Sequence, residues 1–164
     1  MTGENDDKLQ DGPEMPYRGH GAFFGRRKGK TLRPGHAGLL AGALPDLPLA
    51  LDAPPPSDLH ALFHTAVGEI WLEIGFGGGE HLTQRAGENP TVGFIGCEAY
   101  INGTAKMLAQ IEHNDLANIR LWDDDAKAVV EWLPEASISR IYLLYPDPWP
   151  KRRHRKRRFL GEDM

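Results

Sequence analysis

The residues of this sequence best suited to bind a ligand are four carboxylates, each at or near the end of a short apolar run. They are Glu73, Glu98, Asp125 and Asp147. A carboxylate inside an apolar run, as Glu73 is, is costly unless it is paired or bound, so it forms either a structural salt bridge or a ligand contact. Glu98 lies 23 residues after Gly75, close to the spacing at which an acidic side chain accepts hydrogen bonds from a ribose diol.

The first of these runs leads into a glycine-rich segment. Gly75, Gly77 and Gly79 permit tight backbone turns and the close approach of a ligand to the chain. The dinucleotide fingerprint needs its third glycine at the position that Glu80 occupies, which disfavours NAD. Glu73 and Glu80 flank the segment and would repel an anion at the following helix start. The expected ligand therefore carries positive charge or offers hydroxyl donors.

The other two carboxylates stand beside residues that restrict their possible roles. Asp125 ends the triplet Asp123–Asp125; helix capping explains one such acid, whereas three exceed what a cap requires. Asp147 lies between two prolines and precedes Trp149. That arrangement is typical either of a proline-rich turn or of a rigidly mounted acid beside a ring that stacks on a nucleobase.

Alternating apolar runs and amphipathic segments must position these carboxylates. The runs expected to form strands cover residues 70–74, 92–97, 118–122 and 140–145. The segments expected to form helices, with apolar residues on one face, cover residues 79–86, 101–111 and 126–133. This alternation predicts an α/β fold in which a parallel sheet has helices on both faces. Ligands bind such sheets at the carboxyl ends of the strands, where the four acids fall.

Basic residues gather at the two ends of the chain. Six of the 19 Lys and Arg lie between Arg18 and Arg33 and seven between Lys151 and Arg158, while residues 34–150 carry five against sixteen acids. Such runs are either solvated tails or surfaces that bind a polyanion. Seven like charges in eight positions favour the polyanion.

The length of 164 residues predicts about one domain. The first 22 residues show no sustained period and are expected to be disordered or loosely attached, and three prolines in 53–57 mark a boundary. We therefore expect a basic, partly disordered N-terminal segment at 1–52 and a compact domain at 53–164. The lack of a secretory signal, and a single cysteine, Cys97, that is expected to be buried, indicate a cytoplasmic protein.

Together, the acids at the ends of successive runs resemble the class I S-adenosylmethionine-dependent methyltransferases. A closer resemblance, to the tRNA (guanine-N7)-methyltransferase family, covers about residues 17–160. It rests on motifs in the family's order and spacing, namely Leu72–Gly79, Gly96–Glu98, Asp125–Ala126, Pro146–Lys151 followed by Arg157–Arg158, and the basic segment Phe24–Arg27. The proline motif with its basic tail is the specific part, whereas the glycine loop alone indicates only a methyltransferase.

The resemblance implies a Rossmann-like class I methyltransferase sheet whose C-terminal strands are missing, because the family's sheet continues through three further strands. It implies S-adenosyl-L-methionine as cofactor and, as the methylated atom, N7 of a guanine in the tRNA variable loop (position 46). It places Asp147 as the catalytic acid and Lys151 as a substrate contact, and little turnover is expected from the 164-residue chain. The residues that it places at the cofactor are Glu73, Gly75, Gly77, Glu98, Asp125 and Asp147.

Two alternative functions stay open on the residues themselves. One is methylation of an exocyclic amine in a nucleic acid, whose motif is also an acid or amide followed by prolines and an aromatic residue; product analysis distinguishes it. The other is a catalytically weak tRNA-binding fragment, which cofactor binding distinguishes. No apolar stretch is long enough to span a bilayer, and His60 and His64 lack a third ligand, so neither a membrane nor a metal is expected. No protein partner is indicated.

Overall fold

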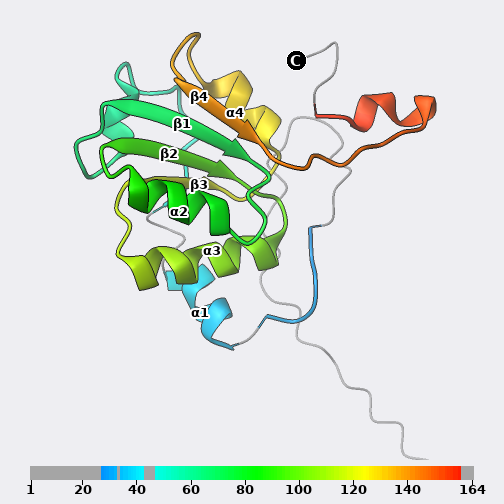
Figure 1. Cartoon of the computed structure of the whole chain (residues 1–164), viewed down its shortest axis with the longest axis horizontal. Helices are drawn as coiled ribbons and strands as arrows, with labels where there is room; N and C mark the ends of the chain where they lie inside the picture. Colours follow the sequence, from blue (N-terminus) through cyan, green and yellow to red (C-terminus); the bar gives the residue numbers. More distant parts are fainter. Residues whose placement is uncertain (1–26, 33, 43–46, 160–164) are drawn as a thin grey trace, which may run out of the picture.

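The computed structural model describes residues 27–32, 34–42 and 47–159, and these form one open parallel sheet with helices around it (Figure 1). The sheet has four parallel strands in the order β3-β2-β1-β4 within the described residues. The strands are β1 Glu69–Ile74, β2 Val92–Cys97, β3 Ile119–Trp122 and β4 Arg140–Leu143. Strand order reverses beside β1, because the chain runs outward through β2 and β3 and then returns to the other side of β1 as β4.

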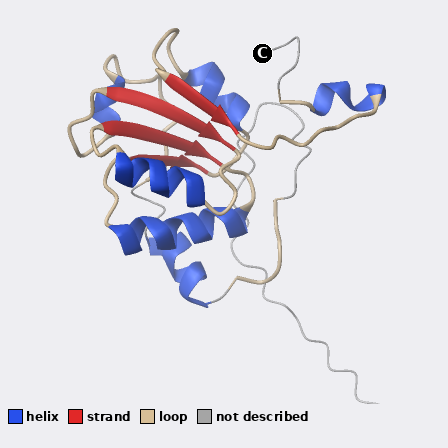
Figure 2. Cartoon of the chain, viewed as in Figure 1, coloured by secondary structure: helices blue, strands red, loops and turns tan. Residues whose placement is uncertain are grey.

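Helices cover both faces of this sheet, as Figure 2 shows. The helices of one face are α2 Glu80–Glu88 and α3 Ile101–Asn114, and those of the other are the short η2 Leu59–Leu62 and α4 Ala126–Trp132. Side chains along β1 point alternately to the two faces of the sheet, so the strand contributes to the hydrophobic core on each face. Trp71 packs with α2 and α3, whereas Ile70 and Leu72 pack with α4 and η2. The sequence-based prediction of a parallel α/β sheet with helices on both faces is confirmed.

The sequence pattern predicted most element boundaries within two residues. Strand β2 spans 92–97 as expected, and β3 begins one residue later than predicted. The predicted end of the fourth strand at Tyr145 was wrong, because β4 ends at Leu143. Tyr145 takes φ = 50°, outside extended geometry, and is 98% exposed. An apolar run thus continues past the point where the backbone leaves the sheet.

Part of the N-terminal segment lies against the domain. Helix α1, Pro34–Gly42, contacts α3. Further along, the backbone of Leu121 in β3 donates to the Leu47 carbonyl at 3.0 Å and accepts from the Leu49 amide at 3.2 Å. Residues 47–49 therefore extend the hydrogen bonding at the β3 edge. The first 22 residues, predicted to be loosely attached, lie outside the described residues.

Cys97 ends β2 with its side chain in the core. It is 1% exposed, and burial raises the pKa of its thiol well above the usual range. The prediction of a buried apolar cysteine is confirmed. Among the helices that the structure describes, none is long and apolar enough to cross a membrane.

Candidate functional site

The glycine loop between β1 and α2 forms the centre of the candidate site. Gly75, Gly77 and Gly79 all have positive φ, at 73°, 59° and 85°, a region that side chains with a Cβ rarely adopt. A Cβ added at Gly75 or Gly77 would meet no atom within 4 Å. The loop therefore presents bare backbone to open space at the carboxyl edge of the sheet, as close approach of a ligand requires.

Glu73, the carboxylate inside β1, is buried and paired. Its side chain is 3% exposed, and its Oε2 lies 2.7 Å from Nδ1 of His81 in the first turn of α2. The His81 ring meets the Tyr142 ring edge-on, with 4.8 Å between their centroids. Burial raises the pKa of Glu73, and the hydrogen bond from His81 opposes that rise. Glu73 is thus paired inside the protein, by a hydrogen bond with a partner, His81, that sequence reasoning missed.

Glu98, at the end of β2, binds the glycine loop directly. Its Oε2 accepts a hydrogen bond from the Gly77 amide at 2.7 Å, and its Oε1 accepts one from the Tyr100 amide at 2.8 Å. A carboxylate has about four acceptor positions, so two remain for a ligand. Glu98 therefore orders the loop and also borders the open space above it.

Two aspartates of the acidic triplet after β3 make different contacts. Asp125 caps α4, because its Oδ1 accepts from the Lys127 amide at 3.0 Å. Asp124 is 6% exposed and forms an ion pair with Arg27, whose carbonyl accepts from the Ile101 amide at 3.0 Å. The cap anticipated for this triplet is present, and the buried aspartate next to it anchors the basic N-terminal segment.

The side chain of Asn102 holds the same segment at the start of α3. Its Oδ1 accepts from the Gly29 amide at 2.9 Å, and its Nδ2 donates to the Lys30 carbonyl at 2.7 Å. A Cβ on Gly29 would lie 2.0 Å from the Tyr100 hydroxyl, so a larger residue here would displace the Tyr100 side chain. The segment 27–30 is thereby held beside Glu98 and the acidic triplet, a contact that sequence reasoning did not foresee.

Asp147 and Lys151 lie on a segment that leaves the sheet. Figure 1 shows the chain after β4 running away from the strands toward η3, Arg152–Arg157. Both side chains are exposed. The Trp149 ring meets the His154 ring edge-on at 5.4 Å, and the Trp149 carbonyl accepts from Arg158 at 3.1 and 3.2 Å. The fold thus groups Glu73, Glu98 and the glycine loop, with Asp125 at the neighbouring strand end, but leaves Asp147 and Lys151 outside that group.

The comparison with family models covers most of the sheet and its site. Residues 68–164 match a family described as "Putative methyltransferase". The chain belongs to this methyltransferase family. This membership, together with the parallel sheet covered by helices on both faces, confirms the predicted Rossmann-like class I methyltransferase fold.

Curated relatives that match this chain are longer than it is. A protein of Rhodopseudomonas palustris named tRNA (guanine-N(7)-)-methyltransferase is 59% identical over 145 residues, which cover 88% of this chain and 58% of that protein. A protein of Rhizobium meliloti with the same name is 60% identical over 141 residues, covering 86% and 61%. The chain therefore spans about three fifths of the length of these relatives.

Two solved structures are similar to parts of this chain. The 16S rRNA methyltransferase KamB is 19% identical, with a TM-score of 0.41 over 54% of this chain and 42% of its own. A SAM-dependent methyltransferase from Geobacter sulfurreducens, in complex with S-adenosyl-L-homocysteine, is 24% identical, with a TM-score of 0.34 over 38% of this chain and 25% of that one.

Proposed function

We propose that this chain supplies the cofactor-binding part of an S-adenosyl-L-methionine-dependent methyltransferase that modifies N7 of guanine 46 in the variable loop of tRNA. The observation that carries the proposal is the open space above Gly75 and Gly77, bordered by the Glu98 carboxylate that also holds the loop. The names of the curated relatives, at 59% and 60% identity, support tRNA guanine as the substrate.

The chemistry of the site suits this cofactor. Its ribose hydroxyls need acceptors, which Glu98 offers, and its positively charged sulfonium and ammonium groups favour an acidic surrounding. Glu73 and Asp125 are the other carboxylates of this group that we assign to it, and the family resemblance adds Asp147, which lies on the segment after β4 and outside the group. Gly75 and Gly77 allow the close approach of the cofactor to the backbone. When bound, the cofactor supplies an electrophilic methyl group.

The acceptor atom requires no general base. Guanine N7 carries an in-plane lone pair and no proton, so the N7–carbon bond forms as the carbon–sulfur bond breaks, and the positive charge passes from sulfur to the guanine. The protein's task is to hold the two groups in line. Asp147 holds and orients the guanine edge, and Trp149 offers a ring for stacking.

Basic residues hold the tRNA through its phosphates. Lys28 and Lys30 are exposed next to the clamped backbone of 27–30, and Lys151 and Arg152 are exposed at the other end of the chain. Contacts of this kind give affinity without reading sequence. We assign RNA holding to the basic residues of 1–52 and of 151–158, and cofactor binding to the domain 53–164. A tRNA substrate supports a cytoplasmic location.

Calorimetric titration of the chain with S-adenosyl-L-homocysteine tests the cofactor proposal. We expect binding by the wild type and a loss of about 1 to 3 kcal/mol in Glu98→Ala, because ribose hydroxyls lose a charged acceptor. Gln84→Ala, on the exposed face of α2, is the control and should bind normally. Equal affinity in a folded Glu98→Ala variant would remove Glu98 from the site.

Product analysis tests the acceptor. Nucleosides from tRNA treated with the protein and cofactor are separated and weighed by mass spectrometry, with N7-methylguanosine as the expected product. Methyladenosine or N4-methylcytidine would replace this proposal with an exocyclic-amine methyltransferase. Tight tRNA binding without any affinity for the cofactor would reduce the chain to an RNA-binding fragment.

A further inference from the structure

One face of α3 lies directly against the glycine loop. Gly103, Met107 and Gln110 are spaced by four and three residues, so they share a face of the helix. A Cβ on Gly103 would lie 2.2 Å from the Gly77 carbonyl oxygen, and a Cβ on Gly79 would lie 2.2 Å from the Met107 sulfur. The loop is therefore packed against α3 without space for any side chain at these glycines.

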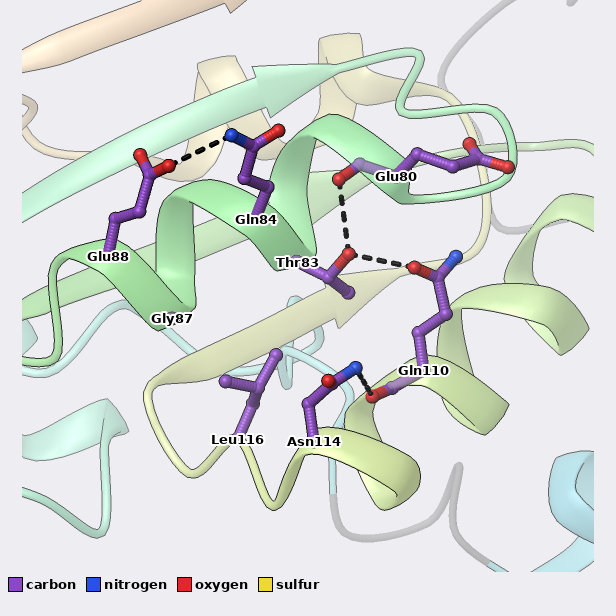
Figure 3. A pocket seen from close by; sticks show the side chains of 8 residues that line it. All are labelled: Glu80, Thr83, Gln84, Gly87, Glu88, Gln110, Asn114 and Leu116. Atoms are coloured by element: carbon purple, nitrogen blue, oxygen red, sulfur yellow. Dashed lines mark hydrogen bonds between the residues drawn. The ribbon is translucent and has the colours of Figure 1, made fainter.

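Gln110 is the polar member of this face and bonds to both the loop and α2. Its Nε2 donates to the Gly78 carbonyl at 2.6 Å, and its Oε1 accepts from the Thr83 hydroxyl at 2.8 Å, as Figure 3 shows for Thr83. The Thr83 hydroxyl also lies 2.8 Å from the Gly79 carbonyl. A carboxamide carries a donor NH2 group and an acceptor oxygen, so it can bond to the Gly78 carbonyl and the Thr83 hydroxyl at once.

A loop rich in glycine needs such fixed contacts. Ordering a residue from a flexible state costs conformational entropy, and glycine has the most freedom to lose. A loop that is ordered before the ligand arrives spares the binding step that cost. Glu98 holds the loop by the Gly77 amide, on the side of the open space. Gln110 holds the next residue by its carbonyl, from the side of α3.

We propose that Gln110 is a positioning residue for the cofactor, a role that rests on the proposed function of the chain. It fixes Gly78 and, through Thr83, the first turn of α2, so that the amides and bare Cα atoms of the loop already have their bound arrangement. It acts from the groove between α2 and α3 rather than from the space above Gly75 and Gly77. The groove is lined by Glu80, Thr83, Gln84, Gly87, Glu88, Gln110, Asn114 and Leu116 (Figure 3).

The chain contains a matched control for this role. Gln84 lines the same groove, but its Nε2 donates to Glu88 of the same helix, at 2.9 Å. Gln110→Met and Gln84→Met therefore remove the same carboxamide from the same groove. Only the first change takes a hydrogen bond from the glycine loop. Gln110→Glu is the second variant, because it keeps an acceptor for Thr83 but cannot donate to the Gly78 carbonyl.

Two measurements test the proposal. Hydrogen exchange of the ligand-free protein should be about tenfold faster at the amides of 76–80 in Gln110→Met, and unchanged there in Gln84→Met. Calorimetry with S-adenosyl-L-homocysteine should show affinity about tenfold weaker in Gln110→Met and Gln110→Glu, with Gln84→Met at the wild-type value. Thr83→Ser, which keeps the hydroxyl, should retain affinity that Thr83→Val loses.

The outcomes separate this inference from the proposed function. Wild-type exchange and affinity in a folded Gln110→Met or Gln110→Glu variant would overturn the positioning role while leaving the function standing. Loss of affinity in Gln84→Met as large as in Gln110→Met would also overturn it, since any groove substitution would then suffice. Failure of the wild type to bind S-adenosyl-L-homocysteine would remove the proposed function together with any cofactor role for Gln110, and exchange alone would then report whether Gln110 orders the loop.

Discussion

The Nδ1 atom of His81 lies 2.7 Å from the Oε2 atom of Glu73, and this contact joins the first turn of α2 to the carboxyl end of β1. The glycine loop lies between these two residues in the chain, so the contact closes its base. Burial raises the pKa of Glu73 above the ordinary 4.5, against the opposing effect of His81. The buried carboxylate is thus held in its charged form at a cost to the folded state.

That cost predicts a pH-dependent difference in stability between the wild type and Glu73→Gln. The folded wild type binds its proton more tightly than the unfolded chain, so its free energy of unfolding falls as pH rises from about 4.5 through the raised pKa. Glutamine has no such proton. The stability of Glu73→Gln relative to the wild type should therefore increase with pH across that window, as measured by urea unfolding. A difference in the free energy of unfolding that is independent of pH would contradict the prediction.

Asp125 permits a test that separates its cap from a ligand contact. Asparagine caps helices as well as aspartate does, so Asp125→Asn should leave stability within about 0.5 kcal/mol of the wild type, whereas Asp125→Ala should cost about 1 kcal/mol. If the charge contacts the cofactor, both variants should bind S-adenosyl-L-homocysteine several-fold more weakly. Unfolding curves and calorimetry on the same samples distinguish the cap from a contact with the cofactor. Normal affinity in Asp125→Asn would leave this residue with the cap alone.

Salt dependence should reveal which basic residues contact tRNA phosphates. Each phosphate contact contributes about 0.7 to 0.9 to the slope of log affinity against log salt. Arg152→Gln together with Arg153→Gln should therefore lower the slope by about 1 to 2, measured by filter binding. Lys106→Gln, an exposed change on α3, removes one charge elsewhere and should leave the slope as it is. An unaltered slope in the double variant would make residues 151–158 a solvated tail.

Asp147 should act on turnover through geometry. In a chimera completed with the parts of the Rhizobium meliloti relative that this chain does not cover, Asp147→Asn should lower N7 methylation by about 10²-fold. The fractional loss of methylation should be the same at every pH, because guanine N7 carries no proton that must be removed. Cofactor affinity should change less than turnover. Rates at several pH values with tRNA in excess provide the measurement. Near-normal turnover, or a loss confined to low pH, would remove the orienting role.

Local pattern predicted the sheet where burial is uniform. Strand β2 is buried at every position and was assigned to the residue, because a continuous apolar run has clear ends. Strand β4 lies at the edge of the sheet, with Ile141 58% exposed. At an edge, the length of an apolar run does not predict where the hydrogen bonding of the strand ends. The two residues after Leu143 were therefore assigned to a strand that the backbone does not form.

The site was predictable where a single residue type implies a ligand. The spacing from the glycines marked Glu98 as a ribose acceptor, but it did not predict the bond from Glu98 to the Gly77 amide. Helix capping was one alternative for the aspartate triplet, and the structure shows Asp125 in that position. His81, Asn102 and Gln110 could not be found in this way. Their partners lie 8 to 73 positions away, and a histidine or an amide on a helix surface carries no local sign of the loop that it will meet.

Because Cys97 is buried, its reaction with a thiol reagent measures local opening of the protein around β2. A thiol reagent can reach this single cysteine only when β2, the strand that carries Glu98 at its end, separates from the core. The rate of labelling under native conditions thus measures how often the central strand is released. Any compound that binds above the glycine loop would slow that labelling in proportion to its occupancy, so one covalent modification, followed by intact mass, can rank ligands without an assay of the reaction.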